Sequence, residues 1–230
     1  MKPEAVVFDL DATLCHYTIS VVEVIERALQ RVGLPSDRFG PVEQLADAYN
    51  RAWWSSEETL RLPTDELRCR AWVSISKDRD VDETTAVRVS DAYSAIRRET
   101  GIRLYEGVPS LLADLRRDHQ IGILTNGPSD MQWEKLRNLD LPPAVDAIVV
   151  AGDLGIFKPD PRPFRQVLAT LGTSPAAAVF VGDSYEHDMV GAHGVGMRTV
   201  WIRTNGVNPR ESSAADHTIG HVGELRELLL

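Results

Sequence analysis

The sequence predicts an α/β protein whose parallel sheet is covered by helices on both faces and interrupted by one all-helical insertion. Residues 6–14 read VVFDLDATL, and an apolar, β-branched run of this kind is typical of a buried parallel strand. Residues 15–103 show helical periodicity and no convincing strand, whereas strands and helices alternate from Gly107 onward. Such alternation produces a parallel sheet between helices. We therefore expect a three-layer, Rossmann-like core from residues 1–14 and 104–230, with a helical cap domain at 15–103.

Composition limits the classes of partner. The chain has 230 residues, 43% of them hydrophobic, and a formal net charge of −9. This length suits one domain with a large insertion. An acidic chain does not hold nucleic acid or an anionic membrane by general electrostatics, so neither is expected as a partner. An anionic ligand must be bound by local charge, and the sequence leaves the oligomeric state open.

The cysteines and the apolar runs bear on location. Cys15 and Cys69 form neither a C-x-x-C pair nor a zinc-ligand spacing. Acids interrupt the apolar run near the N-terminus, and no run reaches the roughly 18–20 residues that cross a bilayer. We therefore expect no signal peptide and no membrane span, and a cytoplasmic protein with reduced cysteines.

The first strand ends in two acids, Asp9 and Asp11. Strand alternation places residues i and i+2 on the same side, so both carboxylates converge while Leu10 points into the core. Two carboxylates this close repel each other unless a cation or a shared proton relieves them. The pair predicts a divalent metal site or an acid and base that share a proton. A polar turn is the alternative, because Asp and Thr are ordinary turn residues.

Four helices are expected in the inserted block. The clearest carries apolar residues from Val21 to Val32 on one face and ends at Gly33, which suits the left-handed conformation after a helix. The others are expected at 41–56, 64–76 and 82–99.

The second half of the chain follows a regular pattern. Helices are expected at 108–118, 129–139, 161–171 and 185–194, and strands at 120–125, 146–151, 177–182 and 198–202. Residues 203–215 are expected to form a surface loop, before an edge strand and a last helix at 223–230.

Ligands of open α/β sheets bind beyond the carboxyl ends of the strands, and suggestive residues stand there in this sequence. Strand 120–125 runs into Thr125 and Asn126, whose hydroxyl and turn amides suit an anionic oxygen at the start of a helix. A simple Thr-Asn-Gly turn is the alternative. Strand 177–182 ends in VGDSYEHD, with Asp183 at its tip and Asp188 about one turn into the next helix. The helix dipole alone also favours acids at that position.

Lys158 is the candidate cation. Pro159 biases it towards an extended backbone, and Asp160 and Pro161 are typical of the N-cap and first residue of a helix. A lysine held between a strand and a capped helix is better placed to point at a ligand than an ordinary surface lysine.

Together, DLDAT, LTN, Lys158 with its proline, and GDSYEHD resemble the four ordered motifs of the haloacid dehalogenase superfamily, spread over residues 6–190. The helical insertion between the first and second motifs is similar to the cap of the subgroup that includes phosphoglycolate phosphatases, small sugar phosphatases and pyrimidine nucleotidases. Ala12 is a departure, since many relatives have Gly there.

The resemblance implies a Mg²⁺-dependent phosphatase that hydrolyses a small phosphorylated metabolite through an aspartyl-phosphate. Asp9 would be the nucleophile, and Asp11 would protonate the leaving oxygen and then activate water. Asp9, the main-chain carbonyl of Asp11, and Asp183 would bind Mg²⁺. Asp188 would orient Lys158 or a metal-bound water.

The resemblance also implies where the substrate binds. Thr125, the Asn126 amide and Lys158 would hold the phosphoryl oxygens. His16 and Tyr17 follow the first motif where the chain leaves for the cap, so they would line the entrance.

Trp54 is the lead within the cap. On helix 41–56, Trp53 lies on the apolar stripe but Trp54 lies off it. Trp54 therefore packs on another cap helix, faces the substrate or faces a partner chain.

The same residues distinguish phosphatase activity from some other functions. Haloacid dehalogenases share the nucleophile but normally lack the second acid, because halide leaves without protonation, so Asp11 favours phosphate chemistry. A phosphomutase of the β-phosphoglucomutase type would keep all these residues and stays open, as do nucleotidase and phosphoglycolate or sugar phosphatase as specific activities. A receiver-type signalling module also phosphorylates an Asp, but it is shorter, carries that Asp on a later strand and has no cap.

Overall fold

A computed structural model describes residues 2–35, 39–54, 61–203 and 213–230. The chain forms two compact units. Met1–His16 and Arg103–Leu230 make one, here called the sheet unit, and Tyr17–Ile102 makes the other, the helical unit. None of the helices in the described part of the chain combines the length and apolar character needed to span a bilayer.

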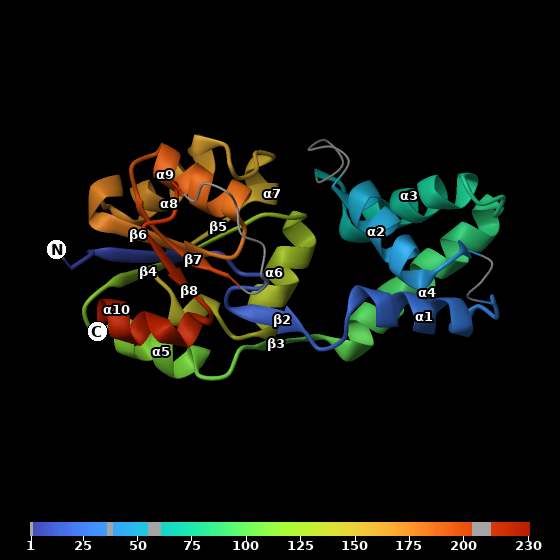
Figure 1. Cartoon of the computed structure of the whole chain (residues 1–230), viewed down its shortest axis with the longest axis horizontal. Helices are drawn as coiled ribbons and strands as arrows, with labels where there is room; N and C mark the ends of the chain where they lie inside the picture. The colour runs from blue at the N-terminus through green and yellow to red at the C-terminus, as the bar shows by residue number, and fades with distance from the viewer. Residues whose placement is uncertain (1, 36–38, 55–60, 204–212) are drawn as a thin grey trace. The chain divides into compact units, whose positions relative to one another are not determined.

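The sheet unit is built on a parallel sheet that has six strands in the described residues (Figure 1). Its spatial order is β5-β4-β1-β6-β7-β8. The strands are β1 (Ala5–Phe8), β4 (Gln120–Thr125), β5 (Ala147–Val150), β6 (Ala178–Gly182), β7 (Arg198–Ile202) and β8 (His217–Ile219). The predicted parallel α/β core is thereby confirmed.

Strand β1 lies in the middle of the sheet, and this position creates the site. Phe8 at its end is paired with Ile123 of β4 on one side and with Val181 of β6 on the other. The chain adds β4 and β5 on one side of β1 and then returns to the opposite side for β6. Ligands bind at such a reversal of strand order, beyond the carboxyl ends of the strands. The ends of β1, β4 and β6 therefore meet where a ligand is expected.

Each face of the sheet is covered by helices, as the alternation along β1 requires. Val6 and Phe8 belong to an apolar cluster that includes residues of α5 (Val108–Leu115), α6 (Ser129–Asn138) and α10 (Leu225–Leu229). Ala5 and Val7 belong to the cluster on the other face, with α8 (Pro161–Leu171) and α9 (Gly191–Gly194). Side chains of successive strand residues point to opposite faces, so a run of four apolar residues needs both helical layers.

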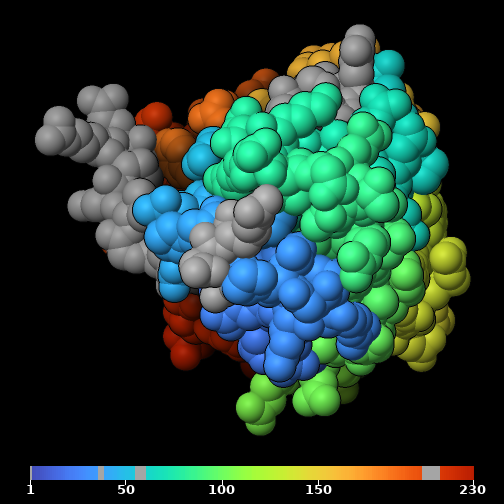
Figure 2. Space-filling view, turned by 90° about the vertical axis from the view of Figure 1, so that its right-hand side faces the viewer, coloured from blue at the N-terminus to red at the C-terminus, as the bar shows by residue number. Residues whose placement is uncertain are grey.

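The helical unit contains α1 (Val21–Arg31), α2 (Val42–Trp53), α3 (Thr64–Lys77) and α4 (Glu83–Thr100). Helix α4 packs against α1 and α3, and Figure 2 shows the surface of this unit from α1 in blue to α3 and α4 in green. Its core is aromatic: the Trp72 ring is fully buried, with ring centroids of Tyr49 at 5.5 Å and Tyr93 at 6.0 Å. The polar side of α1 to α4 thus faces outward around an aromatic centre.

Several boundaries differ from the sequence prediction. The block expected to lack strands begins and ends in a small two-stranded sheet, β2 (Cys15–Tyr17) with β3 (Ile102–Leu104). Strands of three residues are too short to give a periodic signal. Helix α5 ends at Leu115, three residues early, and a short helix α7 (Ala151–Leu154) follows β5. The predicted helix 41–56 ends as α2 at Trp53, and residues 55–60 lie outside the described residues, as does most of the loop 203–215.

The remaining elements are short. They are the 3-10 turns η3 (Pro142–Ala144), η4 (Pro175–Ala177) and η6 (Val222–Glu224), and the π-helix η5 (Tyr185–Val190).

The backbone of Ala12 offers a test of the turn after β1. Ala12 has φ +59°, a left-handed conformation that costs an L-residue roughly 1–2 kcal/mol. We expect Ala12→Gly to leave the melting temperature unchanged or raise it, because relief of this strain offsets the usual entropy cost of glycine, roughly 0.5–1 kcal/mol. Thermal unfolding followed by circular dichroism measures the effect.

The matched control makes the same chemical change where the backbone is helical. Ala169 is exposed on α8, so Ala169→Gly should lower stability by about 1 kcal/mol. Equal losses in both variants would contradict the strain at Ala12.

Candidate active site

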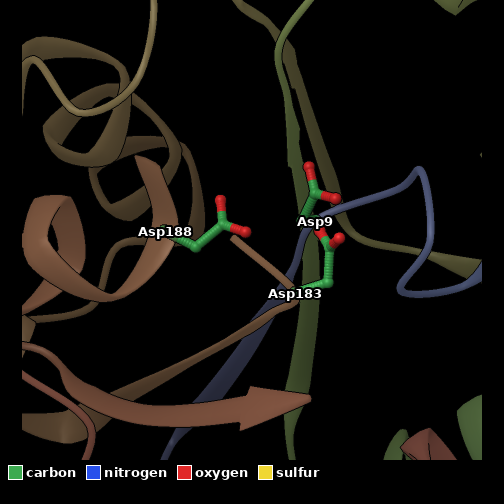
Figure 3. A group of neighbouring side chains, drawn as sticks. All are labelled: Asp9, Asp183 and Asp188. Atoms are coloured by element: carbon green, nitrogen blue, oxygen red, sulfur yellow. The ribbon is translucent and has the colours of Figure 1, made fainter. Parts of the chain in front are cut away.

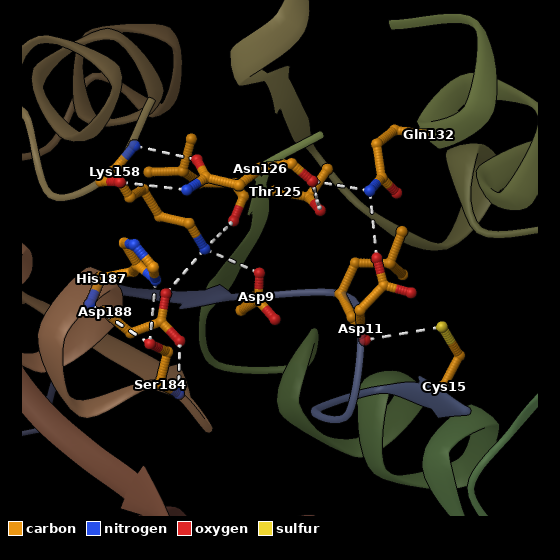
Figure 4. A network of polar contacts seen from close by, with 12 residues as sticks. Asp9, Asp11, Cys15, Thr125, Asn126, Gln132, Lys158, Ser184, His187 and Asp188 are labelled. Atoms are coloured by element: carbon orange, nitrogen blue, oxygen red, sulfur yellow. Dashed lines mark hydrogen bonds and ion pairs between the residues drawn. The ribbon is translucent and has the colours of Figure 1, made fainter. Parts of the chain in front are cut away.

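The side chain of Lys158 connects residues near the ends of β1 and β4 with a residue that follows β6. Its ammonium donates to Oδ1 of Asp9 and to Oδ1 of Asp188, both at 2.7 Å, and to the carbonyl of Leu124 at 3.1 Å (Figure 4). Lys158 is 3% exposed, so its charge is removed from water. Burial alone would lower its pKa, but Asp188 and Asp9 outweigh burial and raise the pKa of Lys158 above its usual value. The ammonium is therefore a fixed positive charge at the end of β1.

The turn after β4 holds Lys158 in place. The Asn126 side chain accepts from the backbone N–H of Lys158 at 2.9 Å and donates to the carbonyl of the same residue at 3.1 Å. On the far side, Asp160 caps α8 and accepts from the N–H of Arg162 at 2.9 Å, as the sequence predicted for this N-cap. Thr125 is buried, and its hydroxyl contacts the Asn126 carbonyl at 3.3 Å.

Asp188 is positioned by the π-helix η5. Its carboxylate accepts the N–H of Ser184 at 3.0 Å, and Ser184 is also the N-cap of that helix. A side chain at Gly182 would collide with it, because a Cβ there would lie 2.3 Å from Oδ2 of Asp188. The sequence predicted an ordinary helix over 185–194; the wider turn places Asp188 against Lys158, and π-helical turns often mark functional sites.

Asp9, Asp183 and Asp188 form an acidic group. One carboxylate oxygen of each lies within 4.8 Å of the others, and Figure 3 shows Asp9 and Asp183 next to each other with Asp188 facing them from the neighbouring helix. Burial raises the pKa of Asp9 to about 8, Lys158 opposes the rise, and Asp188 and Asp183 add to it. Burial, with Asp188, likewise raises the pKa of Asp183 to about 6.

This donor set fits a hard divalent cation. Carboxylates held this close repel each other when ionised, and a cation between them relieves that repulsion. Lys158 is within 2.7 Å of Asp9 and Asp188 and offsets only part of the charge that this group carries when ionised, so a divalent ion can neutralise the remainder. Oxygen ligands of this kind suit Mg²⁺.

Asp11 is not part of this acidic group, whereas the sequence predicted that its carboxylate converges with that of Asp9; strand β1 ends at Phe8, so the alternation of a strand does not extend to Asp11. Lys135 on α6 donates to both of its carboxylate oxygens at 2.8 Å, and Gln132 donates to Oδ2 at 3.0 Å (Figure 4). The side chain thus has its own set of donors. That the main-chain carbonyl of Asp11 binds a metal stays a prediction.

Sequence reasoning missed Gln132 and Lys135. The signal was present: both lie on the predicted helix 129–139, three residues apart, on the face that also carries the fully buried Leu136. Polar residues on a buried helical face need partners, and these two residues find theirs in the carboxylate of Asp11.

The expected entrance residues have different surroundings. His16 belongs to the sheet unit and its ring stacks on Tyr105, with centroids 4.9 Å apart. Tyr17 belongs to the helical unit and lies under the guanidinium of Arg97, 4.2 Å from its ring centroid. Trp54 is 52% exposed, so packing under another helix of the cap is ruled out as its main environment.

Comparison with known families agrees with the motifs. The family model of haloacid dehalogenase-like hydrolases matches residues 3–196. The chain therefore belongs to the haloacid dehalogenase-like hydrolases, which confirms the resemblance drawn from the four motifs.

Curated relatives include phosphatases of several specificities. A phosphoserine phosphatase of Thermus thermophilus and the human N-acylneuraminate-9-phosphatase are each 38% identical over 128 residues, 55% of this chain. The matches span about half of these relatives, 50% and 52%. The Escherichia coli pyrimidine 5'-nucleotidase YjjG is 27% identical over 232 residues, covering 100% of this chain and 99% of YjjG.

Solved structures share the fold over the full chain. A 2-haloacid dehalogenase from Pseudomonas syringae has a TM-score of 0.68 and 28% identity, with 99% of this chain and 98% of that one covered. The Bacillus subtilis protein YfnB, described as a putative HAD-hydrolase bound to magnesium, has a TM-score of 0.75 at 21% identity, with 100% and 99% covered. At 21% identity, the similarity to YfnB shows a shared fold alone.

The raised pKa values predict how pH and metal affect stability. Because Asp9 and Asp183 titrate near 8 and 6 in the folded protein and near 3.8 ordinarily, the metal-free folded state binds more protons than the unfolded state between about pH 4 and 8. The contribution of these two groups to stability therefore falls as pH rises through that window. Cations compete with the same protons, so millimolar Mg²⁺ should raise the melting temperature by several degrees more at pH 8 than at pH 6.

Thermal shift assays on chelated protein, with and without Mg²⁺, measure this difference. Asp183→Asn is the control, since it removes one carboxylate and should weaken both the pH slope and the response to Mg²⁺. An equal Mg²⁺ shift at the two pH values would contradict the assignment.

Proposed function

We propose that the chain is a Mg²⁺-dependent phosphatase that hydrolyses a small phosphate monoester through an aspartyl-phosphate at Asp9. The observation that carries the proposal is the separate setting of two acids after one strand. Asp9 shares the buried ammonium of Lys158, whereas Asp11 is held by Lys135 and Gln132. Each carboxylate has its own lysine, but the side chain of Asp9 is 9% exposed and that of Asp11 is 39% exposed, so Asp11 would be the one that a leaving group can reach.

The first step would be attack on phosphorus. Oδ1 of Asp9 accepts a hydrogen bond from Lys158, so Oδ2 would be the oxygen that attacks phosphorus. A new O–P bond forms as the bond to the leaving oxygen breaks, and Asp11 gives that oxygen its proton. Thr125 and the Asn126 amide, with Lys158, would hold the phosphoryl oxygens and offset the charge that they develop.

The second step would release phosphate. Water attacks the phosphorus of the aspartyl-phosphate, Asp11 takes the proton of that water, and Asp9 is regenerated. Asp9 and Asp183, with the main-chain carbonyl of Asp11, would hold Mg²⁺, which supplies charge neutralisation when bound. Asp188 keeps Lys158 aimed through their ion pair of 2.7 Å.

Relatives support a small phosphorylated metabolite as the substrate class. Those similar to this chain are named for phosphoserine, N-acylneuraminate 9-phosphate and pyrimidine nucleotides. A nucleotidase and a sugar phosphatase are both consistent with the site, since only the leaving group differs. A phosphomutase of the β-phosphoglucomutase type, which returns the phosphoryl group to a sugar, is the alternative outcome of the second step. The cytoplasmic location stays a prediction.

The helical unit is proposed as the cap that selects the substrate. Its boundaries, at Tyr17 and Ile102, are joined to the sheet unit by the two short strands β2 and β3. Short connections of this kind suit a lid that closes over a site. His16, Tyr17 and the exposed ring of Trp54 are the candidate contacts to the leaving group.

Dehalogenation is the second candidate, because the 2-haloacid dehalogenase structure is 28% identical over 99% of this chain. Both reactions begin with attack by an aspartate. Release of halide needs no proton, however, so it gives no use to the second acid, Asp11, or to its donors Lys135 and Gln132. Phosphate chemistry uses both acids.

A panel of substrates distinguishes the two functions. We expect phosphate release from at least one of phosphoserine, a pyrimidine nucleoside monophosphate, a sugar phosphate and phosphoglycolate, and no halide release from 2-chloropropionate. Ion chromatography measures both anions in the same reaction. Halide release without phosphate release would reverse the proposal.

Asp9→Asn should abolish turnover of every phosphate ester that the wild-type protein hydrolyses, a loss of at least about 10⁴-fold, because the amide cannot form the acyl phosphate. Phosphate release measures it, and a far-ultraviolet spectrum checks that the variant is folded. Glu186→Gln is the control: this exposed acid lies between Asp183 and Asp188 in the sequence, has no role in the proposed reaction and should leave turnover unchanged. Turnover by Asp9→Asn within tenfold of wild type would remove the nucleophile.

A further inference from the structure

We infer that Lys135 and Gln132 are positioning residues that hold the Asp11 carboxylate for proton transfer. The inference rests on the proposed phosphatase function, in which Asp11 protonates the leaving oxygen. It concerns two side chains on α6 that belong to none of the four sequence motifs.

The contacts are built to grip one carboxylate. Lys135 donates to both oxygens of Asp11 at 2.8 Å, and Gln132 donates to Oδ2 at 3.0 Å. The two donors come from positions three apart on one helix, so they lie on the same side of α6. Donors on both oxygens fix the rotation of the carboxylate as well as its position.

Burial is unequal across this contact. The side chain of Lys135 is 7% exposed and Gln132 is fully buried, whereas the side chain of Asp11 is 39% exposed. A buried ammonium needs a charged partner, so Lys135 holds Asp11 firmly from the protein side. The other side of the carboxylate remains open. This geometry leaves the acid accessible to a leaving group while limiting its motion.

Gln132 also ties Asp11 to the turn that fixes Lys158. Its Nε2 donates to the carbonyl of Asn126 at 2.6 Å in addition to Asp11, and the Asn126 side chain in turn bonds the backbone of Lys158. Gly127 makes room for this arrangement, since it has φ +123° and a Cβ there would lie 2.6 Å from Nε2 of Gln132. Hydrogen bonds therefore connect both acids to the turn at Asn126, Asp9 through Lys158 and Asp11 through Gln132.

The consequence is specific to reactions that use the acid. Proton transfer depends on the placement of donor and acceptor, and a loosened group loses much of its effect. An alkyl leaving oxygen needs the proton in the first step, whereas p-nitrophenolate leaves without it. Loss of positioning should therefore slow the first step with alkyl phosphates only. It should slow water attack on the aspartyl-phosphate with every substrate.

The test compares Lys135→Met and Gln132→Met with wild type in the presence of Mg²⁺. With an alkyl phosphate that the wild type hydrolyses, we expect kcat to fall about tenfold or more in Lys135→Met and less in Gln132→Met. With p-nitrophenyl phosphate, stopped-flow absorbance should show a burst of p-nitrophenolate at the wild-type rate, followed by slow turnover. Arg137→Met, a cation lost from the exposed face of the same helix, should change neither.

A double-mutant cycle separates positioning from other roles. In an Asp11→Asn background, Lys135→Met should cause no further loss of kcat, because the group that it positions is gone. Lys135→Arg should recover part of the loss, since it restores charge and donors; if Lys135→Met does not fold, Lys135→Arg and Gln132→Met carry the cycle. A full additional loss in the Asp11→Asn background, or an equal slowing of the burst, overturns the inference alone. A wild-type protein that hydrolyses no phosphate ester overturns the proposed function and this inference with it.

Discussion

The buried ion pairs of Lys158 are the interaction on which the site depends. Its ammonium bonds Asp9 after β1 and Asp188 in η5, and its own segment precedes α8. Three separate parts of the chain thereby converge on one point. Removing a partner from a buried pair leaves an uncompensated charge, so each part stabilises the placement of the others. The cost of burying these charges is offset only while the strand ends stay together, which couples the integrity of the sheet to the geometry of the site.

The two acids of the first motif acquire different chemistry from their surroundings. They are two residues apart in sequence, yet the side chain of Asp9 is 9% exposed beside Lys158, whereas that of Asp11 is 39% exposed beside Lys135. One lysine pairs with each acid, and the turn containing Asn126 bonds the backbone of Lys158 directly and the carboxylate of Asp11 through Gln132. Such separate environments would suit the proposed roles, in which Asp9 attacks phosphorus and Asp11 exchanges protons with the reacting oxygens.

The sheet could be predicted because apolar strands alternate with amphipathic helices in the sequence. The positions of the strand ends could be predicted because polar residues interrupt the apolar runs there. Lys158, Asp183 and Asp188 were found this way, as was the N-cap at Asp160. Gln132 and Lys135 were missed because a polar residue inside a helix has the same appearance whether it faces solvent or a buried acid. Short strands such as β2 and the π-helical turn η5 depend on tertiary contacts that no local pattern records. The surroundings of Trp54 could not be predicted for the same reason, because they also depend on tertiary contacts.

The order of strands in the sheet has a consequence for synthesis on the ribosome. Strand β1 is made first but pairs with β4 and β6, so Ala5 waits for Gln120 and Ala178. The helical unit is one continuous segment, Tyr17–Ile102, and all of it emerges before β4 exists. It can therefore fold while β1 is still an unpaired, fully apolar strand. Long-range pairing of this kind is slow and exposed to aggregation. Strand β1 thus remains without either of its sheet partners until β4 has been synthesised.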